Sequence, residues 1–141
     1  IKRRSNLFFR RQESEALAAD ELIVYIDELA EIAKYAGVKI LVNSELKDTV
    51  PVRQACIFYE LSYKVIDWAA KNKNPHIILQ LLRKKEQITL RLLSSEELGS
   101  YEPEEELRGA IALADGAYTK KDLDGAVGIS LTFWQRGNQD V

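Results

Sequence analysis

The sequence predicts an α+β fold, a two-layer α/β sandwich in which helices cover one face of a mixed, mainly antiparallel sheet. Three observations lead to this prediction. Two long segments repeat apolar residues at helical spacing, shorter segments alternate apolar with polar residues, and turn residues join the later segments into hairpins. The chain has 141 residues, of which 46% are hydrophobic, so it can build the core of one domain.

The first half of the chain predicts helix, strand and helix. Residues 20–36 place apolar side chains on one helical stripe, and Gly37 is expected to end that helix. Residues 38–43 alternate apolar and polar side chains, which is typical of a strand. A second helix is expected over residues 52–73, with Cys56 on its buried stripe.

A hairpin and a polar segment come next. Residues 76–82 and 87–93 are two β-rich runs, and the charged turn 83–86 joins them. Both runs are expected to lie in one sheet. The segment 94–101 that follows is short and polar, and we expect a loop there.

A short helix and a closing hairpin complete the predicted order. Pro103 suits the first turn of a helix, and Gly116 is expected to close it. Residues 117–134 then fold back at Asp124-Gly125, because an aspartate-glycine pair favours the tight turn of a hairpin.

Charge and cysteine content narrow the function classes. The 20 basic and 22 acidic residues give a net charge of -2, so no overall field draws the chain to nucleic acid or to an anionic membrane. The single cysteine, Cys56, excludes an internal disulfide and a cysteine-rich zinc site. No apolar run is long enough to span a bilayer, and we expect a cytoplasmic domain without direct membrane contact.

Several segments resemble the catalytic domain of bacterial two-component sensor histidine kinases, in the superfamily of gyrase, Hsp90, histidine kinases and MutL. The opening residues 1–7, Ile-Lys-Arg-Arg-Ser-Asn-Leu, resemble the exit from a dimerisation and phosphoacceptor domain in such kinases. The step Ala36-Gly37-Val38 resembles the alanine-glycine-isoleucine step of the family. The resemblance implies a connector over residues 1–19 and a histidine kinase-like ATPase domain of the Bergerat type over residues 20–141.

The third matching segment, residues 59–69, lies where the family has its N-box helix. Glu60 and Ala69 match the family pattern, but Lys64 stands where the family has an asparagine that holds Mg²⁺. An ammonium cannot ligate Mg²⁺, although it can meet a phosphate directly. The resemblance therefore implies ATP as the candidate cofactor, puts Mg²⁺ in doubt, and assigns Glu60, Lys64 and Asp67 to the nucleotide face.

Only one of the family's glycine boxes has a counterpart in this sequence. Glu97-Leu98-Gly99 resembles the aspartate-x-glycine box, which implies that Glu97 and Gly99 lie near the adenine base. Residues 100–105 leave almost no room for the mobile ATP lid that follows this box in the family. The glycines of residues 125–128 lie in an alternating apolar run, so we interpret them as part of the closing hairpin and not as a second glycine box.

Each feature also has a structural interpretation. Glu60, Lys64, Asp67 and Lys71 share one helical face and can form solvated ion pairs. His76, the only histidine, is expected to be structural, so a phosphoacceptor histidine would have to lie outside these 141 residues. We assign no catalytic residue in the sequence. The basic run 2–11 contains Leu7, Phe8 and Phe9, which favours a connector helix over a nucleic-acid contact.

Two functions remain open. The first is an ATP-binding-type signal-transduction module of a sensor kinase, with weak or lost activity. The second is a pseudokinase that binds no nucleotide and acts as an interaction or dimerisation module. The partners implied by the resemblance are the upstream phosphoacceptor domain, a response regulator and a second copy of the chain, with no nucleic acid and no metal cluster.

Overall fold

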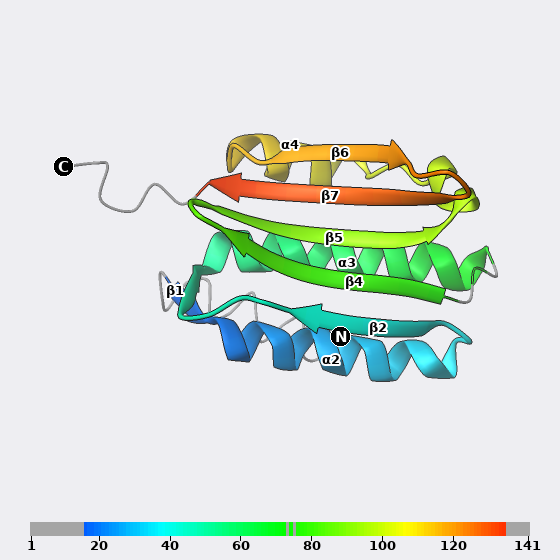
Figure 1. The fold of residues 1–141 in the computed structure, drawn as a ribbon, viewed down its shortest axis with the longest axis horizontal. Coiled ribbons are helices and arrows are strands. Elements are labelled where there is room, and N and C mark those ends of the chain that lie inside the picture. Colours follow the sequence, from blue (N-terminus) through cyan, green and yellow to red (C-terminus); the bar gives the residue numbers. More distant parts are fainter. Residues whose placement is uncertain (1–15, 73, 75, 135–141) are drawn as a thin grey trace.

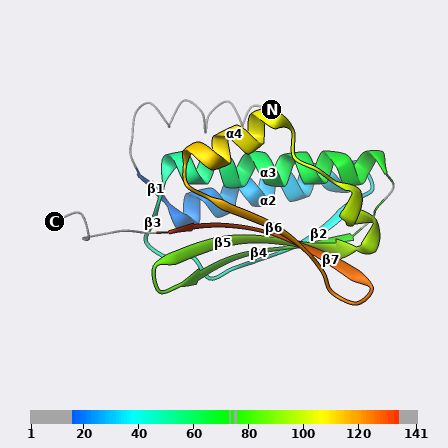
Figure 2. The ribbon, with the colours of Figure 1, turned by 90° about the horizontal axis from the view of Figure 1, so that it is seen from above.

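The computed structural model describes residues 16–72, 74 and 76–134, and it has the predicted two-layer architecture (Figures 1 and 2). Three helices lie on one face of a five-stranded sheet. The elements are β1 (Ala16–Ala18), α2 (Ala19–Tyr35), β2 (Lys39–Ser44), β3 (Thr49–Pro51), α3 (Val52–Lys71), β4 (His76–Lys84), β5 (Gln87–Ser95), the 3₁₀ helix η1 (Glu96–Ser100), α4 (Glu105–Leu113), β6 (Ala117–Asp122) and β7 (Ala126–Trp134).

The sheet is mixed and mainly antiparallel, as expected. Its strand order is β2-β4-β5-β7-β6, and only the β2–β4 pair is parallel. The parallel pair is joined through α3, which packs on one face of the sheet and runs along its strands (Figure 1). Strands β1 and β3 form a separate antiparallel pair at one end of the helices. This arrangement places α3 in the centre of the helical layer, between α2 and α4 (Figure 1).

Gly37 ends the first helix in the predicted way. The φ angle of Gly37 is +82°, in the left-handed region that glycine adopts without a steric penalty. The amide of Gly37 donates to the carbonyl of Lys34 at 3.0 Å, and the amide of Val38 donates to the carbonyl of Ala33 at 3.0 Å. These bonds satisfy the last carbonyls of α2 and turn the chain into β2.

The core lies between the two layers. Phe58 of α3 and Phe133 of β7 are fully buried, and their ring centroids are 5.2 Å apart. Cys56 is buried as expected of a small core residue. Alternate residues of the central strands point into the same core: Ile77, Leu79, Leu81, Ile88, Leu90, Leu92, Val127, Ile129 and Leu131.

Both hairpins are present with tighter turns than a loop would give. The β4–β5 turn consists of Lys85 and Glu86 alone, because β4 continues through residues 83 and 84 of the expected turn 83–86. Asp124 and Gly125 have φ angles of 53° and 93°, and two successive positive φ angles are what the predicted Asp-Gly hairpin turn requires. The glycines of residues 125–128 therefore belong to the closing hairpin, as predicted.

Two further boundaries differ from the prediction. The segment 94–101 is not a plain loop, because β5 continues to Ser95 and η1 follows it. The helix α4 ends at Leu113, and Asp115 adopts the left-handed conformation expected of Gly116, with a φ angle of 58°. A short polar side chain such as aspartate tolerates that conformation.

Part of the predicted organisation lies outside the described residues. This applies to the basic run 2–11 and to residues 1–15 of the predicted connector. The last residues of that connector, Ala16–Ala18, form β1 against β3. Within the described ranges, every helix falls short of the length or apolarity that a membrane span needs.

Candidate functional site

The helix α3 carries Glu60, Lys64 and Asp67 at spacings of four and three residues, which place them on one side of the helix. The Asp67 carboxylate pairs with Lys71 one turn later, with 3.0 Å between Oδ2 and Nζ. This pair is the one expected for a solvated face, and its exposure limits its contribution to stability.

Lys64 forms an ion pair with another part of the chain. Its Nζ lies 2.9 Å from Oε1 of Glu104. Glu104 ends the segment Tyr101–Glu104, which links η1 to α4. This segment is named the connector from here on and is distinct from the predicted N-terminal connector 1–19. The position that resembles the N-box asparagine is thus held by an ammonium group that is paired with a carboxylate of the connector.

Tyr101 packs the connector against α3. Its side chain is 6% exposed, and its ring lies edge-on to Trp68 with 6.3 Å between centroids. Burial raises the pKa of Tyr101, and the charges of Tyr118, Glu104 and Glu60 add to that rise. Tyr101 thus packs on α3 at Trp68 and lies near Glu60, one of the residues that the resemblance assigns to the nucleotide.

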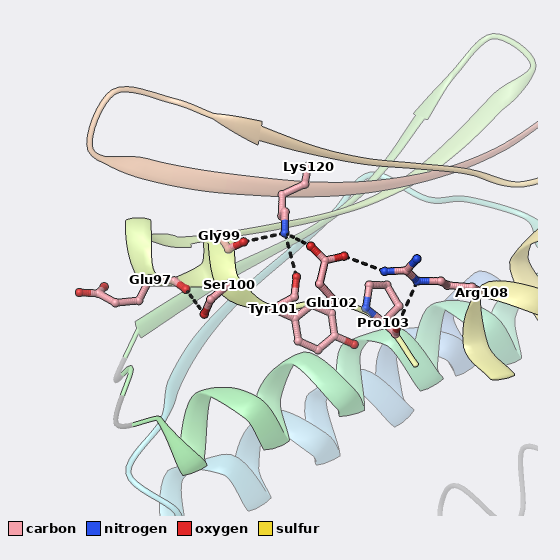
Figure 3. Close-up of polar contacts among 8 residues, drawn as sticks. All are labelled: Glu97, Gly99, Ser100, Tyr101, Glu102, Pro103, Arg108 and Lys120. Atoms are coloured by element: carbon pink, nitrogen blue, oxygen red, sulfur yellow. Dashed lines mark hydrogen bonds and ion pairs between the residues drawn. The ribbon is translucent and has the colours of Figure 1, made fainter. Parts of the chain in front are cut away.

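Lys120 of β6 holds the connector from the other side (Figure 3). Its ammonium donates to the carbonyl of Gly99 at 2.6 Å and to the carbonyl of Tyr101 at 2.9 Å. It also donates to Oε2 of Glu102 at 2.6 Å. The hydrogen bond and charge of Lys120 hold the pKa of Glu102 below its usual range. One side chain therefore binds two backbone carbonyls and one carboxylate between Gly99 and Glu102, at the end of η1 and in the connector.

Arg108 of α4 extends this network (Figure 3). Its Nη2 lies 2.8 Å from Oε1 of Glu102, and its Nε donates to the carbonyl of Pro103 at 3.0 Å. Together with the Lys64–Glu104 pair, these contacts join the connector to α3, α4 and β6.

Glu97 and Gly99 lie in η1, one on either side of Leu98, which is fully buried. The carboxylate of Glu97 is exposed and points away from the other side chains drawn in Figure 3. Ser95 donates a hydrogen bond to it, and this bond lowers the pKa of Glu97. Gly99 contributes its carbonyl to Lys120.

The predicted residues are thus divided between two elements, Glu60, Lys64 and Asp67 on α3 and the remaining two on η1. The connector and Lys120 were not predicted. A signal for Lys120 was available, because its position in β6 points toward the core in register with Ile129. A lysine whose stem is covered in this way needs hydrogen-bond acceptors for its ammonium, and these come from residues 18–21 positions earlier.

The donor set does not fit a metal ion. In the part of the chain that the structure describes, no three histidine, cysteine, aspartate or glutamate side chains are grouped as metal ligands. At the N-box position itself, the group is the ammonium of Lys64, which has no lone pair to offer.

Known structures identify the fold. The chain is similar to the catalytic domain of histidine kinase ThkA in a nucleotide-free form, with 13% identity and a TM-score of 0.65 over 85% of this chain and 94% of that chain. It is also similar to the histidine kinase domain of the blue-light activated histidine kinase EL346 from Erythrobacter litoralis, with 12% identity and a TM-score of 0.67 over 94% and 73% of the two chains.

A third similar structure is histidine kinase AdeS from Acinetobacter baumannii, with 8% identity and a TM-score of 0.62 over 96% of this chain and 75% of that chain. No protein-family model and no curated protein sequence matches the chain. The domain therefore has the fold of histidine kinase catalytic domains, as the resemblance implied.

Proposed function

We propose that this chain is the ATP-binding-type domain of a bacterial sensor histidine kinase and that its nucleotide site is closed by its own connector. On this proposal the domain works in the cytoplasm as a pseudokinase. It passes signals through its surfaces to the upstream phosphoacceptor domain, to a second copy or to a response regulator. The shared fold supports the family assignment.

The observation that carries the pseudokinase assignment is the position of the connector on α3. Tyr101 packs on Trp68, and Glu104 pairs with Lys64 on the helix that resembles the N-box. A nucleotide whose phosphates met Lys64 would have to displace Glu104, and the carboxylate would repel those phosphates. The connector has only four residues, so it cannot swing away from α3 while Lys120 holds it to β6.

The alternative is a domain that still binds ATP. It is supported by the carboxylate of Glu60 on α3 and by Glu97 and Gly99 at the start of the segment that follows β5. On this alternative, Glu60 and Lys64 face the phosphates and Glu97 accepts a hydrogen bond from the adenine amino group.

Calorimetric titration with ATP, with and without Mg²⁺, separates the two. We expect no saturable heat up to about 1 mM ATP, which corresponds to a binding free energy weaker than about -4 kcal/mol. Circular dichroism of the same sample must show a folded domain. Saturable binding in the micromolar range would reject the closed site and support the alternative.

A pair of variants tests the mechanism of closure. The double change Lys64→Asn and Lys120→Met supplies a neutral oxygen where Mg²⁺ needs one and releases the connector from β6. We expect this variant to gain Mg²⁺-dependent binding of ATP. The matched control is Lys71→Asn with Lys120→Met, which makes the same change of side chain about two helical turns further along α3 and should gain nothing. Equal behaviour of the two variants would count against the N-box assignment.

A further inference from the structure

The sheet face opposite the helices carries no carboxylate on its strands. Figure 2 shows α2, α3 and α4 on one side of the sheet, and no helix or strand of the described residues covers the other side, here named the open face. By register, the outward-pointing residues of the five described strands include no aspartate or glutamate. They include the cations Lys39, Lys84, Arg91 and Lys121, all exposed. A chain with a net charge of -2 thus has a basic open face.

One row of this face is apolar. The register aligns Leu41, Ile78, Leu93 and Gly128 across neighbouring strands, with Lys121 at the end of the row. The side chains of Leu41 and Ile78 are 57% and 38% exposed. Exposing such a row of aliphatic side chains to water costs free energy, and covering it with another apolar surface is favourable.

Gly128 allows the row to continue to the last hairpin. A Cβ atom at this position would lie 3.0 Å from Cδ2 of Leu93 and 3.1 Å from Cδ1 of Leu123, so these two leucines close over the bare glycine. Leu123 is 43% exposed. The apolar row therefore crosses the whole sheet from β2 to the β6–β7 turn.

A hollow of about 420 Å³ lies at this end of the row. Leu93, Leu123 and Gly128 form its apolar part, and Arg91 and Lys121 form its charged part. Within the described residues, the side chains of Arg91 and Lys121 form no hydrogen bond and no ion pair. Two cations next to an apolar surface are available to carboxylates of another molecule.

We propose that this open face, the row Leu41, Ile78, Leu93 and Leu123 with the cations Arg91 and Lys121, binds an acidic amphipathic helix of a partner protein. The spacing of about 4.8 Å between strands makes the row about 19 Å long. A helix of about 13 residues has that length and can place one apolar stripe along it. Acidic residues beside the stripe would then meet Arg91 and Lys121.

The chemistry of the face favours this partner over the others. Single-stranded nucleic acid needs aromatic side chains for base stacking, whereas the row is aliphatic. A second copy that docked through the same face would bring its cations against Lys39, Arg91 and Lys121. An acidic helix meets both the apolar row and the charge, and the contact does not use the connector or α3.

Fluorescence anisotropy with a labelled peptide tests the proposal. The probe is a peptide of about 14 residues with leucines at helical spacing on one side and glutamates on both flanks. We expect saturable binding to the full chain, and at least about ten-fold weaker binding by the double variant Arg91→Glu and Lys121→Glu. Ile78→Ser should weaken it without any change in charge.

The control variant Lys34→Glu and Arg53→Glu makes the same charge change on the helical layer and should bind like the wild type. Amide chemical shifts should move in β4, β5 and β7 when the peptide is added. Equal binding of a scrambled peptide, equal loss in the control variant, or tighter binding of an oligonucleotide or of phosphatidylglycerol vesicles would overturn the proposal. Concentration-dependent dimerisation that Ile78→Ser abolishes would overturn it as well, in favour of a second copy.

Discussion

Gly116 sets how closely the chain after α4 approaches the sheet. A Cβ atom there would lie 2.7 Å from Cε1 of Phe133 and 3.1 Å from Cγ2 of Ile111. Phe133 is fully buried, so it cannot move away without disturbing the core. The backbone of Gly116 has no special φ angle, and its requirement for glycine is therefore steric.

We expect Gly116→Ala to lower the free energy of unfolding by about 1–3 kcal/mol, which is the usual cost of overpacking a well-packed core. The measurement is equilibrium unfolding in urea. The matched control is Gly109→Ala in the middle of α4, where a Cβ atom meets nothing within 4 Å. That change should stabilise the domain by about 0.5–1 kcal/mol, because alanine is the better helix former. Equal effects of the two changes would contradict the steric explanation.

Tyr118 carries a buried hydroxyl group whose oxygen has no hydrogen-bond partner in the part of the chain that the structure describes. Burial is the main cause that raises the pKa of Tyr118 to about 12, from 10.0, and the charge of Glu102 adds to it. The neutral phenol is therefore favoured in the folded state. The contribution of this raised pKa to the stability of the folded state is fully present below pH 10, and it is lost as the pH rises through about 12.

Removing this hydroxyl should not destabilise the domain. We expect Tyr118→Phe to leave the free energy of unfolding unchanged or to raise it by up to about 1 kcal/mol, because an unpaired polar group no longer has to leave water. Absorbance titration of the phenolates should lose a component that titrates near pH 12. A loss of stability above about 1 kcal/mol would mean that the hydroxyl has a partner after all.

At the scale of elements, the connector depends on Lys120, which bonds to the carbonyls of Gly99 and Tyr101 and to the carboxylate of Glu102. Lys120→Met keeps the aliphatic stem and removes these three bonds. We expect the amides of the connector to exchange with solvent at least about ten-fold faster, because local opening of the segment becomes easier. Lys121→Met, next along β6 and pointing to the other face, should leave them unchanged.

The same contact predicts a dependence on pH. Lys120 lowers the pKa of Glu102 from its ordinary value of 4.5. At pH values above 4.5, the ionised carboxylate therefore stabilises the folded connector. That part is lost as the pH falls through the lowered pKa. The difference in amide protection between the wild type and Lys120→Met should therefore shrink in acid. A difference that stays constant from pH 7 to about pH 3 would show that the two carbonyl acceptors alone hold Lys120.

Local patterns account for most of what the sequence could predict. Gly37 and the Asp124-Gly125 turn act on their immediate neighbours, and the alternating strands reveal their buried face without reference to other elements. The connector could not be predicted in this way. Its Lys120, Lys64 and Tyr101 contacts join residues that are far apart in sequence, so they exist only once the sheet and α3 have come together.

The site could be predicted only as far as its helix. The pattern of apolar residues predicts α3 and places Glu60, Lys64 and Asp67 on one side of it. The pattern of α3 gives no sign that Lys64 also pairs with Glu104, which lies 40 positions later in the sequence. That pair depends on how closely the connector approaches the helix.

For the whole molecule, the decisive contact is the one between the two layers. Phe58 of α3 and Phe133 of β7 meet in the centre of the core, and both are fully buried. Because the helices of the domain rest on this one sheet, the layers should not unfold separately. Two tryptophans report on the two layers, since Trp68 lies in α3 and Trp134 ends β7.

We expect Phe58→Ala to lower the free energy of unfolding by about 3–5 kcal/mol, the usual cost of a large cavity. With a total stability of about 5–15 kcal/mol, the variant should still fold. In urea, the fluorescence of Trp68 in a Trp134→Phe background and that of Trp134 in a Trp68→Phe background should change at the same midpoint, both in the wild type and in Phe58→Ala. If the two midpoints separate, each layer has its own stability, and signals between the helical layer and the open sheet face could not pass through a shared core.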